Sequence, residues 1–116
     1  MHFKLICAFV EDAKTDKIME AVREAGVTGG TIINNARGEG MRANKTFLGL
    51  SLESQRDILF FLVEEHMSRN ILELIAEVGR FEEEPGTGIA FKMDVDDVVG
   101  VSQQVRKLQH LVEDEL

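Results

Sequence analysis

The chain has 116 residues and a formal net charge of −8, with 44% hydrophobic and 29% charged residues. These values predict one globular domain, 1–116, with a modest core. The negative charge argues against general binding of nucleic acid or acidic membranes, and no apolar run reaches the length of a membrane span. Cys7 is the sole cysteine, which excludes an internal disulfide, and the first residues do not resemble a signal peptide. We therefore expect a cytoplasmic protein.

The first half of the chain predicts strand, helix and strand. The predicted ranges are Phe3–Val10 for the first strand, Thr15–Ala25 for the helix and Gly30–Asn35 for the second strand. Thr15 or Asp16 is the expected helix N-cap, and Gly26 stands in the position of a left-handed residue after the helix.

The second half repeats this order. The predicted ranges are Asp57–Glu64 for a strand, Ser68–Val78 for a helix capped by Ser68, and Ile89–Val95 for the last strand. Gly79 follows the second helix as Gly26 follows the first. The resulting β-α-β-β-α-β order predicts an α+β, ferredoxin-like sandwich, an antiparallel sheet with both helices on one face.

Two strands are apolar on both faces, which two helices on one side cannot explain. Leu5–Val10 and Ile58–Val63 lack polar side chains entirely. The second face is expected to be covered either by the C-terminal segment or by self-association. A C-terminal helix is predicted over 97–116 from a 3-4-3-4 seam of Val98, Val101, Val105, Leu108 and Val112. Its partner is either its own subunit or a neighbour.

Two segments could carry a binding site. The stretch 37–46 in a long non-periodic segment holds three basic residues against one acidic residue, which indicates an anion-binding or partner-docking loop, or simply a solvated one. Phe47–Leu52 is too apolar for a solvated loop and predicts a hairpin arm or a partner contact. Gly86-Thr87-Gly88 opens into the last strand, and its backbone N–H groups could hold an anion or merely turn a corner.

The chain resembles the nitrogen-regulatory PII and PII-like signalling proteins over nearly its whole length to Val99. Glu24–Thr31 resembles the end of the family's first helix and the start of its second strand, and Arg37–Gly40 resembles the base of its T-loop. Gly86–Phe91, followed by Asp94-Val95, resembles its B-loop and last strand.

This resemblance implies a homotrimer with its sheets facing inward. It implies an effector site, for ATP or ADP, in each cleft between subunits, and a T-loop-like segment, 37–55, that binds a target transporter or enzyme, here in nitrogen metabolism. By position, the implied nucleotide-binding residues are Thr31, Arg37, Gly38 and Gly40, with Gly86, Thr87 and Gly88 from the B-loop-like segment 82–88. The implied partner-binding residues are Arg42, Lys45 and Phe47.

The sequence departs from the family pattern at the glycine turn. Ile89 stands where a lysine is expected, and Glu82–Glu84 adds negative charge nearby, so Arg37, Arg42 and Lys45 would have to supply the positive charge. The chain has no tyrosine, which excludes regulation by tyrosine uridylylation.

Two other functions remain open from the sequence. One is a trimeric divalent-cation-binding protein resembling the cation-tolerance group, and the other is an interaction subunit that binds no ligand. The three histidines, His2, His66 and His110, lack metal-ligand spacing. We therefore predict no catalytic or metal-ligating residues and no enzymatic activity.

Overall fold

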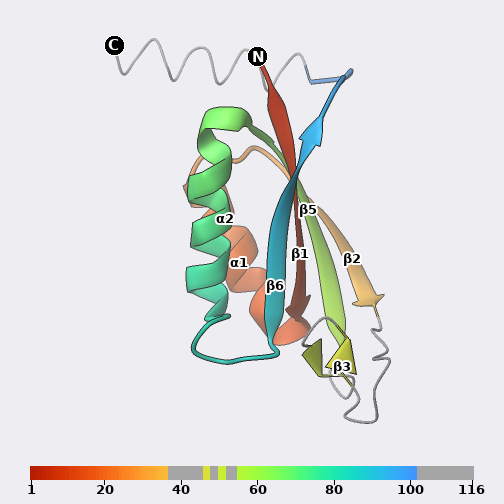
Figure 1. The fold of residues 1–116 in the computed structure, drawn as a ribbon, viewed down its shortest axis with the longest axis vertical. Coiled ribbons are helices and arrows are strands. Elements are labelled where there is room, and N and C mark those ends of the chain that lie inside the picture. The colour runs from red at the N-terminus through yellow and green to blue at the C-terminus, as the bar shows by residue number, and fades with distance from the viewer. Residues whose placement is uncertain (37–45, 48–49, 52–54, 102–116) are drawn as a thin grey trace.

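The computed structural model describes residues 1–36, 46–47, 50–51 and 55–101. Four strands form an antiparallel sheet in the order β2-β5-β1-β6, and both helices lie on one side of it (Figure 1). The elements in chain order are β1 (Phe3–Glu11), α1 (Asp12–Glu24), β2 (Thr31–Ala36), β3 (Thr46–Phe47), β4 (Leu50–Ser51), β5 (Arg56–Glu64), α2 (Glu65–Gly79) and β6 (Gly88–Val95). The predicted ferredoxin-like α+β fold is confirmed.

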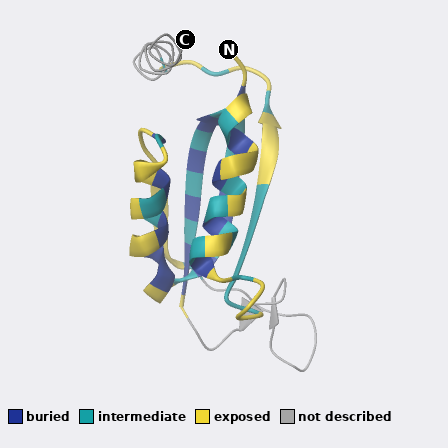
Figure 2. Cartoon of the chain, turned by 90° about the vertical axis from the view of Figure 1, so that its left-hand side faces the viewer, coloured by how far each residue is buried: buried dark blue, intermediate teal, exposed yellow. Residues whose placement is uncertain are grey.

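The core lies between the sheet and the two helices, and Figure 2 shows the buried residues, in dark blue, along the strands and on the helices that cover them. Alternate residues of β1 and β5 face the helices, because successive side chains of a strand point to opposite faces. From β1 and β5 these are Ile6, Ala8, Val10, Leu59, Phe61 and Val63. The helices contribute Ile18, Val22, Ile71 and Ile75 from apolar stripes at helical spacing.

The other side of the sheet, here called the open face, is also apolar. Its side chains follow from the cross-strand register, and they are Leu5, Cys7, Phe9, Ile33, Ile58, Phe60, Leu62, Ile89, Phe91 and Met93. Met93 and Ile33 are 44% and 46% exposed. Cys7 is buried because Phe60 and Phe91 flank it on the neighbouring strands, and this burial raises the pKa of its thiol. In the described ranges neither helix packs on this face.

The first helix begins earlier than its predicted cap. It starts at Asp12, directly after β1, and its N-cap residue, Glu11, makes no side-chain cap bond. Carbonyl oxygens of neighbouring loops replace the side-chain cap, since the amide of Glu11 donates to Thr87 O at 3.0 Å and that of Asp12 to Gln55 O at 3.3 Å. The prediction that Thr15 or Asp16 caps this helix is therefore wrong, although Gly26 does adopt the expected positive φ, 107°.

The second helix also differs at both ends. It begins at Glu65, and the Glu64 carboxylate caps it by accepting from the amide of His66 at 2.8 Å. Ser68 is not the N-cap, because it lies inside the helix, buried, and donates to Glu65 O. Arg80, with φ 55°, is the left-handed residue that was predicted at Gly79.

The remaining predicted elements are described in part. Of the segment predicted as a hairpin arm or a partner contact, the described residues Phe47, Leu50 and Ser51 belong to β3 and β4, which pair in a sheet separate from the main one. The helix predicted over 97–116 does not begin at 97, because residues 97–101 are not helical and Gly100 has a φ of 88°. Residues 102–116 lie outside the described ranges.

Candidate ligand site at one end of the sheet

The glycine turn, defined here as Glu84–Gly88, connects the segment after α2 to β6. Thr87 closes it by donating to Glu84 O from both its amide, at 3.3 Å, and its hydroxyl, at 2.7 Å. Gly86 has a φ of 82°, in the left-handed region that disfavours other residues. Gly88 already belongs to the sheet, where it pairs with Val10 of β1.

The glycine at position 88 has a packing explanation. A Cβ atom there would overlap the ring of Phe81, which also lies against Gly79 at the end of α2. Phe81 packs against the core between these two glycines. The ring needs both positions to lack side chains, so Gly88 does not by itself indicate a ligand cradle.

A buried lysine holds the glycine turn against the helices. Lys14 of α1 is 6% exposed, and its ammonium donates to Glu84 Oε2 at 2.5 Å, to Thr87 Oγ1 at 3.0 Å and to Gly79 O. The Lys14 ammonium donates a hydrogen bond to the Glu84 carboxylate, and this bond lowers the pKa of that carboxyl group. The turn is therefore fixed by an ionic group from a distant part of the chain.

A buried arginine joins the same turn to the strands. Arg56, 3% exposed at the start of β5, donates from Nη2 to Gly86 O at 3.2 Å, and its Nη1 lies 3.5 Å from Glu11 Oε1. Arg56 also pairs with Ala36, the last described residue of β2. Ala36, which precedes the segment 37–45, and the glycine turn therefore both contact Arg56, the first through its backbone and the second through its side chain.

A second buried polar pair supports this end of the molecule. The Thr15 hydroxyl of α1 donates to Asp57 Oδ2 of β5 at 2.6 Å, and both residues are buried. A hydrogen bond to a buried carboxylate satisfies a group that would otherwise be costly to remove from water. Lys14 and Thr15 thus connect the first turn of α1 to two different segments.

The predicted site residues lie in the glycine turn, on two strands and outside the described ranges. Gly86, Thr87 and Gly88 form the turn described above, whereas Thr31 is exposed on β2, at the opposite edge of the sheet from β6. Within one chain, Thr31 and the turn do not meet. Five predicted residues lie outside the described ranges, and they are Arg37, Gly38, Gly40, Arg42 and Lys45. Phe47 belongs to β3.

Ile89 lies on the open face of the sheet, where it pairs with Phe9. The resemblance described in the sequence analysis implies a lysine at this position. The side chain here extends the apolar surface formed with Phe91, whose ring lies 5.8 Å from that of Phe9 in an edge-to-face arrangement. In the described part of the chain, the positive groups that donate hydrogen bonds to the turn are instead Lys14 and Arg56, and Arg80 lies nearby with its Nε 3.9 Å from Glu84 Oε1.

Neither Lys14 nor Arg56 was among the site residues predicted from the sequence. Lys14 is in phase with the apolar stripe of α1, four residues before Ile18 and eight before Val22. A lysine in such a stripe is a signal for a buried, paired ammonium, because an unpaired buried charge is too costly. Arg56 had a weaker signal, its position immediately before a strongly apolar strand.

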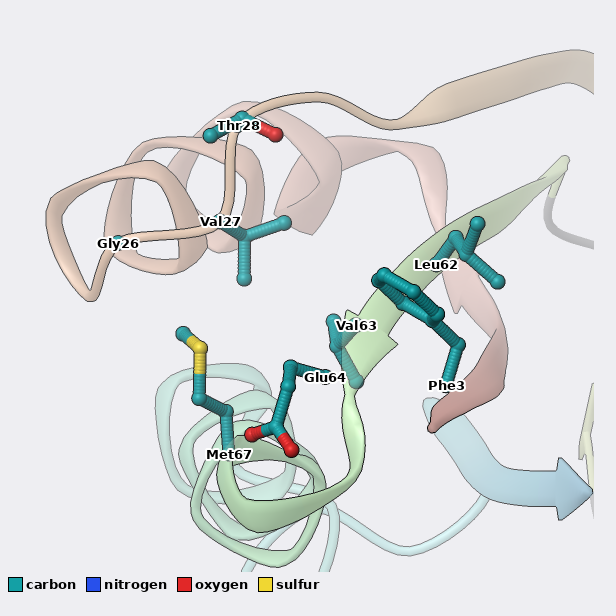
Figure 3. Close-up of a pocket in the computed structure, with 8 residues that line it drawn as sticks. All are labelled: Phe3, Gly26, Val27, Thr28, Leu62, Val63, Glu64 and Met67. Atoms are coloured by element: carbon teal, nitrogen blue, oxygen red, sulfur yellow. The ribbon is translucent and has the colours of Figure 1, made fainter. Parts of the chain in front are cut away.

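A small cavity lies at the other end of the sheet (Figure 3). Its volume is about 20 Å³, and its lining residues are Phe3, Gly26, Val27, Thr28, Leu62, Val63, Glu64 and Met67. Val27 and Met67 point toward one another across it. A cavity of this size holds about one water molecule, so within a single chain it is no nucleotide site.

Two other kinds of feature are absent from the part of the chain that the structure describes. The described residues include no group of three or more His, Cys, Asp or Glu side chains that could hold a metal ion. Among the helices of the described ranges, none is long and apolar enough to cross a membrane.

The described fold and site define a class of protein, a ferredoxin-like α+β domain with a glycine turn and the base of a long segment at one end of its sheet. The family model for nitrogen regulatory protein P-II matches residues 3–105, and the chain belongs to this family. The family is one of regulatory proteins, as its name states.

One similar solved structure is the apo form of CPII, a nitrogen regulatory PII-like protein from Thiomonas intermedia. It is 22% identical to this chain, with a TM-score of 0.63, and the match covers 82% of this chain and 90% of that one. This likeness supports the fold. A search of the curated proteins finds no match.

Proposed function

We propose that the protein is a PII-like regulator that senses a small anionic effector, an adenine nucleotide such as ATP or ADP, in clefts between the subunits of a homotrimer. Effector binding changes how the segment 37–55 docks on a target transporter or enzyme, with nitrogen metabolism as the suggested setting. The protein acts by binding in the cytoplasm and catalyses no reaction. Membership of the P-II family supports the regulatory role.

The observation that carries this proposal is the position of Arg56. Its guanidinium bonds Gly86 O, and its backbone pairs with Ala36, so the glycine turn and the base of the segment 37–55 share one anchor. An effector bound at the turn would therefore act on residues next to that segment. Coupling between two sites requires such a shared physical element.

The carbonyl groups of the turn favour an anion over a cation. Gly86 O accepts from Arg56 and Thr87 O accepts from the amide of Glu11, so both oxygens are already engaged by the protein. A carbonyl oxygen that accepts no hydrogen bond repels an approaching anion. Because these two oxygens are already hydrogen-bonded, the turn repels an anion less than free carbonyl groups would. Arg37, Arg42 and Lys45 are the proposed additional positive charges, since Ile89 supplies none.

The open face of the sheet supports the proposed trimer. It carries Leu5, Phe60 and Phe91 among its side chains and has no covering helix within the described ranges. A large, apolar, regular surface is typical of an obligate interface between subunits. Thr31 and the glycine turn, on opposite edges of one sheet, would then reach a shared cleft from different subunits.

A nucleotide titration tests the proposed function. The melting temperature is measured with ATP, ADP and AMP, with and without Mg²⁺, followed by calorimetry on any ligand that stabilises the chain. A ligand at 100 times its Kd stabilises by about 2.7 kcal/mol. Gly86→Val and Arg37→Ala are expected to weaken binding about tenfold or more. Arg69→Ala removes an exposed arginine of α2 and is the control.

The absence of any nucleotide-dependent stabilisation, together with no heat of binding at millimolar concentration, would reject the effector. Equal binding by Gly86→Val and the wild-type chain would place the site elsewhere.

A further inference from the structure

Lys14 connects three segments that are far apart in the chain. Its ammonium lies where the first turn of α1, the last turn of α2 and the glycine turn meet, with Gly79 O, Glu84 Oε2 and Thr87 Oγ1 as its acceptors. Its side chain is 8% exposed. A buried ammonium with three acceptors is an organised junction, because a loosely held one would not stay buried.

The junction leaves Lys14 no donor for a ligand. A lysine ammonium has three N–H donors, and three protein acceptors use them. The Thr87 hydroxyl is committed as well, since it accepts from Lys14 and donates its proton to Glu84 O at 2.7 Å. Neither side chain is therefore available to bind a phosphate directly.

Lys14 also places a positive charge directly at the last carbonyl of α2. The last turn of α2 contains no basic residue, and the C-cap residue, Arg80, directs its guanidinium toward Glu84, with its Nε 3.9 Å from Glu84 Oε1. The carbonyl groups at a helix C-terminus carry partial negative charge and favour a nearby cation. The Lys14 ammonium at Gly79 O meets this need from a different helix.

We propose that Lys14 is the positioning residue of the glycine turn. It holds Glu84 and Thr87 in the arrangement that presents the backbone of Gly86–Gly88, and the loss of its ammonium releases the turn while the sheet stays intact. The effect on the free chain is independent of any ligand. Its consequence for effector affinity rests on the proposed function.

Amide hydrogen exchange in the ligand-free chain tests the proposal. The amide of Thr87, bonded to Glu84 O, and the amide of Glu11, bonded to Thr87 O, report directly on the turn. In Lys14→Met we expect both to exchange about tenfold or more faster, as for the loss of hydrogen bonds to a charged group. Core amides of β1, such as that of Ile6, are expected to keep their protection.

Three further variants keep the test decisive. Arg23→Met removes an exposed basic residue from the last turn of the same helix and is the matched control for charge, so its turn amides are expected to exchange as in the wild type. Thr87→Val removes one acceptor of Lys14 without changing the charge, and Thr87→Ser restores it. We expect the Glu11 amide to exchange faster in Thr87→Val and at the wild-type rate in Thr87→Ser.

Unchanged turn amides in Lys14→Met would overturn the proposal, whatever Thr87→Val shows, because Thr87→Val also removes the hydroxyl bond to Glu84 O. So would exchange that rises equally across the core and the turn in Thr87→Val, because that result indicates a general stabilising role. If the turn amides respond and the wild-type chain binds no nucleotide, the positioning role stands and the proposed effector fails.

Discussion

The substitution Gly88→Ala tests whether packing explains the glycine at the end of the turn. A Cβ atom at position 88 would meet three atoms of the Phe81 ring, with Cζ at 2.5 Å and Cδ1 at 2.6 Å among them. Ordinary carbon contacts lie at about 3.5–4.0 Å and the nearest ring atom, Cε1, would lie closer than Cζ or Cδ1, so the ring would have to retreat by about 1.5 Å or more. Phe81 is partly buried and packs against the core, which restricts this movement.

Overpacking of this kind costs about 1–3 kcal/mol of unfolding free energy. The assay is urea unfolding followed by circular dichroism at one fixed protein concentration, since self-association makes the stability depend on concentration. Gly29→Ala is the matched control, because a Cβ at position 29 meets nothing within 4 Å. We expect it to change the stability by no more than about 0.5 kcal/mol.

A double-mutant cycle shows whether the cost arises at the Phe81 ring. Phe81→Leu shortens the ring side chain, so the combined variant with Gly88→Ala is expected to be more stable than the sum of the two single changes by about 1 kcal/mol or more. Wild-type stability of Gly88→Ala, or strict additivity in the cycle, would refute the packing explanation. Gly88 would then be a candidate for direct contact with a ligand.

The remaining predictions concern the open face and helix α2. Phe91→Asp places a charge on the open face, and we expect sedimentation velocity to show that the proposed trimer dissociates. The control is Glu20→Gln, a substitution at an exposed residue of α1, which is expected to leave the sedimenting species as in the wild type. A monomeric wild-type chain at micromolar concentration would contradict this prediction. The hydrogen bond to Glu64 raises the pKa of His66 above its ordinary value of 6.5. Because protonation is favoured in the folded state, this pair stabilises the fold below about pH 6.5 and loses that contribution as the pH rises through the raised pKa. His66→Ala is expected to remove this pH dependence from the unfolding free energy, and an identical pH profile in wild type and variant would disprove it.

The fold could be predicted because its main signals are periodic. The apolar run of β1, the stripe Ile18 and Val22, and the matching pattern of the second half each depend on burial of residues close in sequence. Helix starts were less predictable. The expected caps at Thr15 and Ser68 follow local preferences, yet both residues are buried inside their helices. The Thr15 hydroxyl donates to Asp57 of β5, whereas the Ser68 hydroxyl donates to Glu65 O of its own helix and accepts from Lys92 of β6.

The backbone elements of the candidate site could be predicted from the sequence, whereas the charged side chains that contact the turn could not. Gly86-Thr87-Gly88 and the basic segment after Ala36 are visible as local composition, and the structure brings their neighbourhoods together through Arg56. The ammonium at the turn comes from Lys14, 70 positions away from Glu84, and no local pattern links the two. The packing of the Phe81 ring against position 88, which requires a glycine there, likewise could not be predicted from the sequence.

The sequence by itself therefore determined the order of strands and helices, the face that each helix buries and the apolar character of both sheet faces. Hydrophobic periodicity acts over a few neighbouring residues, so one chain suffices to read it. The tertiary structure decided which charges and rings meet at the glycine turn. Those contacts join α1, α2, β5 and β6, and they exist only once the sheet register brings Lys14, Arg56 and Phe81 to the same end of the molecule.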